Sequence, residues 1–366
     1  MAAGGTGGHV FPAIAIAEEV MRRDPSNRVL FIGTARGMAG RVVRDAGYRF
    51  CAVRGGGLAG GVSGALSGLA QTAMGAAQAF AAVRDFRPDV AVGTGGYASV
   101  PGAVAALLRG VPLAVCEQNS APGLANKALA VAARRVFLSF PHSGGARRSG
   151  KFRLVGNPVR RTVVTAALES AAPRRFPRSG TPTLFILGGS QGAAALNRAI
   201  PPAVSLYKER TGTGVRVIHQ TGRGAEREVA AAYRRAGVQA RVFDFSPAVA
   251  EFYAEADLVI SRSGAGAVAE TALFRVPSIL IPYPLAARGH QRENAVMMER
   301  AGASALIDEA GLTKEAVAKT LEKLLNWNTL EAMSRAAAGV AAPDAASRVA
   351  DGIETLVRGE PVARKV

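Results

Sequence analysis

The chain has 366 residues, of which 49% are hydrophobic and 20% charged, so it is too apolar for a disordered protein and long enough to form two domains. Its 45 Lys and Arg against 27 Asp and Glu give a net charge of +18, which favours anionic partners such as metabolites, lipid headgroups or nucleic acid. Nucleic acid fits least well, because the arginines are scattered and only 6% of residues are aromatic rings on which bases could stack.

Cysteine usage and hydropathy narrow the class further. Cys51 and Cys116 do not form a Cys-x-x-Cys motif, so we expect two free thiols in a reducing cytosol. The sequence contains neither a signal peptide nor an uninterrupted apolar run of about 18 residues, so no membrane-spanning helix is predicted.

The first predicted element is a glycine-rich turn, GGTGGH, that leads into a helix with Pro12 in its first turn. Such a turn is typical of a cradle for a phosphate or a sugar diphosphate. It lacks the lysine of a GxxxxGK[ST] loop, so a Walker-type ATPase is not indicated. His9 stands at the junction of turn and helix, where it is either a general base or a structural histidine.

Only Met1, Ala2 and Ala3 precede this turn, although a strand of about five residues is expected there. Either the recorded start lies too far downstream or the first strand is very short. If the chain starts at Met1, we expect the sheet to lose pairing beneath the first glycine turn.

Strands and helices then alternate through the first half of the chain. Apolar runs predict strands at 28–33, 48–53, 88–92, 112–116, 135–140 and 152–155. The strand at 88–92 ends in a second glycine turn, GTGGY, and the strand at 112–116 ends in Glu117, Gln118 and Asn119. Ligands bind outside the carboxyl ends of parallel strands, so these side chains are candidates for a site.

Residues 55–82 form a segment of small residues without charge, and the second half of this segment is predicted to be helical. The pattern fits a helix packed on the sheet. It fits equally a face that dips into a bilayer surface, aided by Arg54 and Arg84.

The second half repeats the plan. Strands are predicted at 183–187, 215–219, 240–243, 258–260, 278–282 and 305–307, and helices at 194–208, 313–326, 329–338 and 345–358. A third glycine turn, GGSQGA, follows the strand at 183–187, and a fourth, SGAGAVAE, follows the strand at 258–260. We expect a polar loop after the strand at 278–282, with His290, Gln291, Glu293 and Asn294.

Residues 256–295 form the most informative of these units. Glu270 lies about one helical turn beyond the fourth glycine turn, where a carboxylate could accept hydrogen bonds from the two hydroxyls of a ribose. The alternative is an ordinary surface turn beside a glutamate in a salt bridge.

These elements predict an α/β protein with two Rossmann-like domains, parallel sheets flanked by helices, that face a deep cleft. The expected boundaries are 1–157, 158–340, and a C-terminal helix and basic tail, 341–366, that packs back on the first domain. The glycine turns favour a nucleotide sugar over a dinucleotide, because the first turn lacks a GxGxxG with a later acidic residue. The sequence contains no Asp-x-Asp, so we expect no metal clamp of that kind and no cofactor.

Nine motifs follow one another in the order and spacing of one family: GGTGGHVFPAIAIAEEV, GTARGM, GTGGYASVPG, EQNSAPGLANK, GNPVR, LGGSQGA, QTG, SRSGAGAVAE and PYPLAARGHQRENA. Over nearly its whole length the chain resembles the MurG family of peptidoglycan N-acetylglucosaminyltransferases. The resemblance implies a GT-B fold and transfer of GlcNAc, with inversion, from UDP-GlcNAc to the C4 hydroxyl of MurNAc in undecaprenyl-diphospho-MurNAc-pentapeptide, which converts lipid I to lipid II. It also implies a peripheral protein on the cytoplasmic face of the inner membrane, with an anionic membrane surface and no nucleic acid as partner. Proteins of cell-wall synthesis and division are further candidates.

The resemblance assigns residues to the donor UDP-GlcNAc. Glu270 matches the carboxylate that holds the uridine ribose, and Ser246 lies where the backbone reads uracil. The residues assigned to the diphosphate and the sugar are Arg160, Ser190, Arg262, Ala265, Gly266, His290, Gln291 and Asn119. Thr6, Gly7 and Gly8 are assigned to substrate binding as well.

On the acceptor side, the resemblance implies that the loops holding the lipid diphosphate include Gly5, Gly95, Gly96 and Tyr97, beside Thr6 to His9. His9 or Glu117 could take the proton from the attacking hydroxyl. Helix N-termini near Ser190 and Ala265, with Arg160 or Arg262, could stabilise the charge on the departing UDP.

The chain departs from the family pattern at three positions. Ala39 replaces a usual Glu, Ala267 a common Thr, and Gly57 a frequent Lys, so a specific charge contact with lipid is in doubt. The alternatives are a GT-B enzyme with another lipid acceptor, such as a diacylglycerol glycosyltransferase, a UDP-GlcNAc 2-epimerase, or a nucleotide-sugar sensor that binds without turnover.

Overall fold

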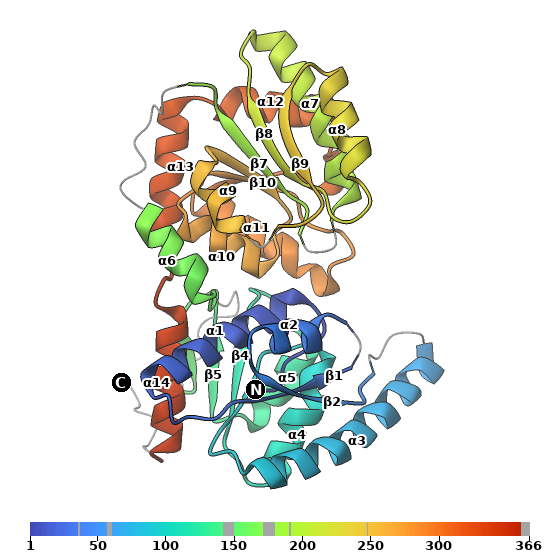
Figure 1. Cartoon of the computed structure of the whole chain (residues 1–366), viewed down its shortest axis with the longest axis vertical. Coiled ribbons are helices and arrows are strands. Elements are labelled where there is room, and N and C mark those ends of the chain that lie inside the picture. Colours follow the sequence, from blue (N-terminus) through green and yellow to red (C-terminus); the bar gives the residue numbers. More distant parts are fainter. Residues whose placement is uncertain are drawn as a thin grey trace. The chain divides into compact units, whose positions relative to one another are not determined.

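The computed structural model describes residues 1–35, 37–56, 61–141, 150–170, 180–189, 192–246 and 248–359, with the backbone alone at 61–66 and 69. The chain forms two compact units (Figure 1): unit 1 is Met1–Arg161 with Ala342–Val366, and unit 2 is Thr162–Ala341. The domain boundaries expected from the sequence were 157/158 and 340/341.

Unit 1 alternates strands and helices, as its apolar runs predicted. Its elements are α1 (Gly7–Arg23), β1 (Leu30–Thr34), α2 (Ala39–Asp45), β2 (Arg49–Val53), α3 (Gly61–Phe86), β3 (Ala91–Gly93), η1 (Tyr97–Ser99), α4 (Val100–Leu108), β4 (Leu113–Glu117), α5 (Leu124–Ala132), β5 (Arg135–Leu138), β6 (Phe152–Leu154) and α14 (Ala345–Val357). All strand pairs are parallel, in the orders β1-β2 and β3-β4-β5-β6.

The first three residues join these two sheets. Ala2 forms parallel bridges to Ile32 of β1 and to Gly93 of β3. Its amide donates to Val92 O at 2.7 Å, and its carbonyl accepts from Thr94 N at 3.1 Å. The expected loss of pairing beneath the first glycine turn is therefore wrong for the residues directly below it, because a very short strand pairs with both neighbours. The resulting strand order has its switch point at Ala2.

Helices cover both faces of this sheet. Ala91, Leu113, Val115 and Val136 pack with α4 and α5, whereas Val92, Ala114, Cys116 and Phe137 pack with α1 and α14. The alternation follows from the two-residue period of a strand. Cys51 and Cys116 are both free thiols, and burial, with a smaller effect of the Glu117 charge, raises the pKa of Cys116 to about 12.

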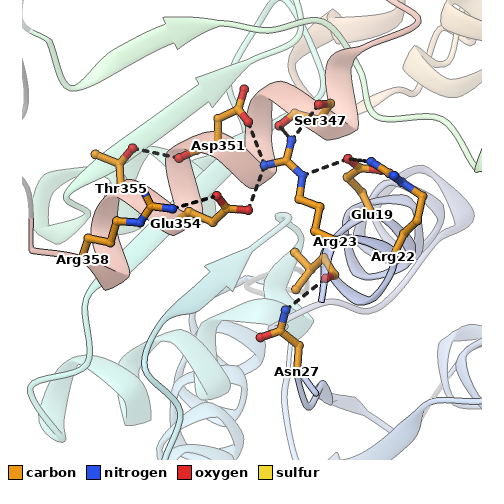
Figure 2. Close-up of polar contacts among 10 residues, drawn as sticks. Glu19, Arg22, Arg23, Asn27, Ser347, Asp351, Glu354, Thr355 and Arg358 are labelled. Carbon is orange, nitrogen blue, oxygen red and sulfur yellow. Dashed lines mark hydrogen bonds and ion pairs between the residues drawn. The ribbon is translucent and has the colours of Figure 1, made fainter. Parts of the chain in front are cut away.

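A cluster of charges fastens α14 to α1 within unit 1 (Figure 2). The guanidinium of Arg23 contacts Glu19 at 3.0 Å, Asp351 at 2.8 Å and Glu354 at 2.9 Å, and it donates to the hydroxyl and carbonyl of Ser347. Gly352 contributes as well, because a Cβ there would lie 2.3 Å from the ring of Phe137. The C-terminal helix is thereby fixed against the sheet of unit 1.

This cluster predicts a pH dependence of stability. Hydrogen bonds from Arg22 chiefly, and also from Arg23, lower the pKa of Glu19 from its ordinary 4.5 to about 2, although burial opposes the shift. A carboxylate with a lowered pKa in the folded state stabilises the protein above its unfolded pKa, and this stabilisation is lost as pH falls through the folded pKa. We therefore expect the Glu19 contribution to be complete above about pH 4.5 and to disappear towards about pH 2.

The measurement is urea unfolding of the wild type and of Glu19→Gln across that pH window, followed by circular dichroism. The difference in unfolding free energy between the two proteins should shrink as pH falls. Glu228→Gln, at an exposed glutamate in a helix of unit 2, is the control and should show no such trend. A Glu19→Gln difference that stays constant from pH 5 to pH 2 would contradict the assignment.

Unit 2 is a second doubly wound α/β domain. Its elements are α6 (Arg161–Ser170), which begins at the boundary, β7 (Thr183–Leu187), α7 (Ala194–Thr211), β8 (Arg216–Gln220), α8 (Glu226–Arg235), β9 (Gln239–Phe243), α9 (Val249–Glu255), β10 (Leu258–Ser261), α10 (Ala265–Leu273), β11 (Ser278–Leu280), η2 (Ala287–Gly289), α11 (His290–Arg300), β12 (Ser304–Leu306), η3 (Glu309–Gly311), α12 (Lys314–Leu324) and α13 (Trp327–Val340). The parallel sheet has the order β12-β11-β10-β7-β8-β9.

The two faces of this sheet have different cores. Leu184, Ile186 and Ile260 face a hydrophobic core that also contains side chains of α7, α8 and α12. The ribbons of these three helices are labelled in Figure 1. Phe185 points to the other face, where its ring contacts Phe252 at 5.7 Å and Tyr253 at 5.3 Å. Strand order reverses between β7 and β10, so the switch point of unit 2 lies between these two strands.

One expectation about unit 2 is wrong. Residues 290–294, predicted as a polar loop, form the first turns of α11. Their polarity is that of an amphipathic helix: Asn294, Ala295 and Met298 are buried at helical spacing, whereas Arg292 and Glu293 are exposed. His290 and Gln291 therefore project from a helix N-terminus and not from an irregular loop.

Candidate functional site

Two glycine turns meet at the switch point of unit 1. Gly4 follows the short first strand, and a Cβ on it would lie 2.6 Å from the Cβ of Ala98 in the second turn. In that second turn Gly95 and Gly96 have φ of 96° and 74°, values that favour glycine. The two turns can approach this closely because Gly4 has no side chain where it meets Ala98.

The first turn is shorter than the sequence indicated. Gly7, Gly8 and His9 already belong to the first turn of α1, and Gly5, with φ of 84°, is the residue that needs glycine for its backbone. Gly7 is required for space, because a Cβ on it would lie 2.9 Å from the ring of Phe11. Thr6, Gly7 and Gly8 thus present the free amides of a helix N-terminus.

His9 is half-buried, and its Nδ1 faces two oxygens: Thr94 O at 2.9 Å and Gln118 Oε1 at 3.2 Å. It also packs on the second glycine turn, because a Cβ on Gly96 would lie 3.1 Å from its Cδ2 and 3.5 Å from its Nε2. The absence of that side chain leaves space beside Nε2. The structure therefore brings His9 and the second glycine turn together at one edge of the sheet.

Glu117 lies at the end of β4, but its side chain is only 3% exposed. One carboxylate oxygen accepts from Asn119 N at 2.9 Å and Asn119 Nδ2 at 3.4 Å, and the other from Gly123 N at 3.1 Å and Asn126 Nδ2 at 2.8 Å. Its acceptor sites are committed to the segment that leads into α5. The carboxylate shapes this segment and holds the side chain of Asn119.

The remaining predicted residues of unit 1 lie around the same edge. Tyr97 opens η1 directly after Gly96 and is exposed. The guanidinium of Arg160 lies 4.6 Å from the ring centroid of Phe11, which is two residues after His9 on α1. Arg160 is therefore held beside the first turn of α1, through a cation–π contact.

In unit 2 the third and fourth glycine turns flank the switch point. A Cβ on Gly188 would lie 2.9 Å from Ala193 N, and a Cβ on Gly192 would lie 2.4 Å from Thr221 O. Close contacts therefore exclude side chains at Gly188 and Gly192, whose amides donate to Gln220 O and Gly189 O, both at 3.1 Å. Ser190, predicted to meet the phosphate, lies outside the described residues.

The fourth turn leads into α10, where Ala265 and Gly266 form the first turn of the helix. Glu270 is half-buried one turn further along. Burial and the charge of Glu270 raise the pKa of the Tyr253 phenol well above its ordinary value, so the two side chains are neighbours. The side chain of Glu270 thus lies beside the buried side chain of Tyr253.

Arg262 is tied to the protein. Its guanidinium forms an ion pair with Glu309, donates to Ile281 O at 3.2 Å and Pro282 O at 3.3 Å, and lies 5.4 Å from the ring centroid of Tyr283. These contacts brace the loop after β11 against the fourth turn.

The first turn of α11 supplies two polar groups with defined orientation. Gln291 Oε1 accepts from Tyr283 N at 3.0 Å, which leaves its Nε2 as the donor for a ligand. His290 Nδ1 donates to Ala287 O at 2.7 Å, which leaves its Nε2 as the acceptor of the neutral ring. The hydroxyl of Ser246 accepts from Ala248 N at 3.1 Å, just before the start of α9.

Sequence reasoning named Gln118 only as a candidate at a strand end, and it did not predict the contacts that hold the predicted site residues in place. Gln118 contacts His9, Asn126 contacts Glu117, and Tyr253 supports Glu270. The signal for Gln118 was present, because it lies between two predicted site residues at the end of a strand. No comparable signal marked Tyr253, which the sequence shows as an apolar helix residue.

Two α/β units, each with a parallel sheet and glycine turns at the switch point, define a GT-B glycosyltransferase fold. Residues 1–138 match the family model described as "Glycosyltransferase family 28 N-terminal domain", and residues 183–349 match the "Glycosyltransferase family 28 C-terminal domain". The chain belongs to this family and, within it, to the MurG enzymes.

Individual relatives support this placement. The UDP-N-acetylglucosamine–N-acetylmuramyl-(pentapeptide) pyrophosphoryl-undecaprenol N-acetylglucosamine transferase of Syntrophus aciditrophicus is 40% identical over 360 residues, 98% of each chain. The crystal structure of Acinetobacter baumannii MurG matches with a TM-score of 0.79 and 29% identity, covering 96% of this chain and 98% of that one. UDP-GlcNAc 2-epimerase from Neisseria meningitidis matches with a TM-score of 0.65, 13% identity and coverage of 97% and 98%, which shows the shared fold alone.

Proposed function

We propose that this protein transfers GlcNAc from UDP-GlcNAc to the C4 hydroxyl of MurNAc in undecaprenyl-diphospho-MurNAc-pentapeptide, and so converts lipid I to lipid II in peptidoglycan synthesis. The observation that carries the proposal is the setting of His9, whose Nδ1 is engaged by two oxygens and whose Nε2 stands beside a side-chain-free glycine turn. The near-full-length similarity to a transferase named for these substrates supplies their identity.

The donor is assigned to unit 2. Glu270 accepts hydrogen bonds from the ribose hydroxyls, and the amides of the third and fourth glycine turns face the diphosphate. Gln291 donates to the sugar through Nε2, because its Oε1 already accepts from Tyr283 N. Arg262, tied to Glu309, shapes the fourth turn and adds positive charge near it.

The chemistry is a single displacement. The C4 hydroxyl attacks the anomeric carbon and loses its proton to His9 Nε2, while the bond from that carbon to the UDP oxygen breaks. One direct displacement inverts the anomeric configuration and needs no covalent nucleophile on the protein. Helix N-terminal amides and arginine charges stabilise the negative charge that develops on UDP.

The acceptor is carried by a lipid, so we propose that unit 1 sits peripherally on the cytoplasmic face of the inner membrane. Two facts support this: the net charge of +18 favours an anionic surface, and the described part of α3 exposes Met74, with the Arg54 Nη1 3.7 Å from its sulfur. Among the described residues, none of the helices combines the length and apolarity needed to cross a membrane. Gly57, which takes the place of a frequent Lys, lies outside the described residues.

The donor assignment is tested by Glu270→Ala. Because a hydrogen bond to a charged group contributes about 1.5–3 kcal/mol, we expect the Kd for UDP-GlcNAc to rise by about tenfold to a hundredfold. Isothermal titration with UDP-GlcNAc measures this change. GlcNAc transfer from labelled donor to a short-chain lipid I analogue shows whether the wild type carries out the reaction.

Glu228→Ala, at an exposed glutamate on α8, is the matched control and should bind and transfer as the wild type does. Unchanged UDP-GlcNAc binding in Glu270→Ala would remove Glu270 from the donor site. Donor binding by the wild type without transfer to the analogue would reject the proposed reaction.

A further inference from the structure

The side chain of Gln118 is locked in one orientation. Its Nε2 lies 3.2 Å from the carbonyl oxygen of Cys116, which can only accept, so this atom must be the donor end of the amide. Its Oε1 is thereby the atom that faces His9 Nδ1 at 3.2 Å. Gln118 is 1% exposed, so water does not compete for either end.

This orientation determines which imidazole nitrogen carries the proton. Both neighbours of His9 Nδ1, Thr94 O and Gln118 Oε1, are acceptors, so Nδ1 must be the protonated nitrogen. In the neutral ring, Nε2 then holds the free lone pair. That nitrogen is the one beside Gly96, where a Cβ would lie 3.5 Å away.

We propose that Gln118 is a positioning residue for the reaction: with the Thr94 carbonyl it holds His9 as the Nδ1–H tautomer and so directs the basic Nε2 towards the acceptor hydroxyl. This inference rests on the proposed function, in which His9 is the base. It adds the group that gives the base its orientation and tautomer. A neutral amide in this place fixes the ring without adding a charge.

Charged and titratable groups on the surrounding elements can also affect the pH profile of the enzyme, so they must be considered in a test that varies pH. Glu117 on β4 is bound to backbone and amide donors, and Cys116 is a buried thiol. The others on the elements that pack near His9 are Glu18, Glu19, Arg22 and Arg23 on α1, Tyr97 after the second turn, Lys127 on α5, and Arg160 beside Phe11. All of them stay unchanged in variants of Gln118, so a change in the pH profile reports on the new side chain.

The kinetic test compares Gln118→Met with Gln118→Glu. Methionine keeps the size and loses the acceptor, so we expect kcat to fall about fivefold to tenfold, the effect of one hydrogen bond, with KM for UDP-GlcNAc within twofold. Glutamate restores an acceptor towards His9 Nδ1 and, when ionised, adds a charge that stabilises protonated His9, although it loses the bond from Gln118 Nε2 to Cys116 O. It should recover kcat at high pH and move the acidic limb of the kcat/KM profile about one unit higher.

Gln239→Met is the matched control, because Gln239 is exposed at the start of β9, on the opposite edge of unit 2 from its glycine turns. It should leave kcat and the pH profile as in the wild type. A Gln118→Met enzyme with wild-type kcat, or a Gln118→Glu enzyme with an unshifted acidic limb, would overturn the proposal.

A second measurement does not depend on turnover. Nitrogen-15 NMR of histidine-labelled protein distinguishes protonated from unprotonated ring nitrogens, and the His9 signals are identified by their loss in His9→Ala. We expect Nδ1 to be the protonated nitrogen of the neutral ring, and the His9 titration to move to higher pH in Gln118→Glu. A proton on Nε2 in the wild type would overturn the inference even if transfer is observed. The expected tautomer without any transfer would instead reject the proposed reaction while leaving the role of Gln118 in orienting the ring intact.

Discussion

Replacing His9 by alanine is expected to lower kcat for GlcNAc transfer by about a thousandfold, within the range of general-base catalysis. The C4 hydroxyl would then have to lose its proton to water. The donor is assigned to unit 2, so KM for UDP-GlcNAc should stay within about threefold of the wild type. Initial rates with labelled UDP-GlcNAc and a lipid I analogue, taken across pH 5–9, give both constants.

The same pH series tests the mechanism. In the wild type, kcat/KM should rise with pH as the imidazole loses its proton, and this limb should be missing in His9→Ala. Val131→Ala, at a side chain that is 83% exposed on α5 of the same unit, is the control for a small truncation outside the glycine turns. If His9→Ala keeps wild-type kcat and its acidic limb, His9 is not the base, and Glu117 is the next group to consider.

The alternation of buried strands and helices in both units was predictable from the sequence. Runs such as Leu184–Leu187 and Leu113–Cys116 are apolar without interruption because helices cover both faces of a parallel sheet. Glycine turns at the strand ends were predictable for a similar reason: close approach of two backbones, as at Gly192 and Thr221, excludes side chains. The apolar runs and the glycine motifs are short continuous stretches of sequence, so sequence patterns reveal them.

The missed features depend on contacts between distant residues. The start of α11 was predicted as a loop because the side chains of His290 to Glu293 are all polar. The buried side of this helix is recognisable only once the packing of Asn294 and Met298 is known. Arg262 forms an ion pair with Glu309 at the start of η3, and no motif or spacing in the sequence indicates this contact. The first three residues were too few to predict a strand, yet pairing with β1 and β3 on both sides orders them.

The distinction between Glu117 and its neighbour Gln118 also depends on the fold. Both are polar and both follow the same strand, so sequence alone left Glu117 as the second candidate for the base. In the structure, the carboxylate accepts four hydrogen bonds from the segment 119–126, whereas the amide of Gln118 reaches His9. As a carboxylate, Glu117 was a reasonable candidate for proton transfer. Its four hydrogen bonds indicate instead that it supports the segment 119–126.

This difference makes Glu117 a position where substitution should affect stability and transfer together. Replacing it by alanine should lower the free energy of unfolding of unit 1 by about 3 kcal/mol, because donors of Asn119, Gly123 and the buried Asn126 would lose a charged acceptor. Transfer should be lost with it, since Asn119 and the start of α5 would no longer be held. Amide hydrogen exchange, resolved on peptides from β4 and α5, measures the loss of local stability.

Glutamine at this position separates support from catalysis. Glu117→Gln keeps one carbonyl acceptor and the size of the side chain, so a supporting residue should retain transfer within about tenfold, with a limited loss of exchange protection. A general base, by contrast, would lose about a hundredfold or more in kcat while protection in β4 and α5 stayed at the wild-type level. Because Asn119 N and Gly123 N bind different carboxylate oxygens, one amide oxygen can satisfy only one of them. Transfer activity and amide-exchange protection should therefore fall together in both variants. A fall in activity without a loss of protection would indicate that Glu117 is the general base.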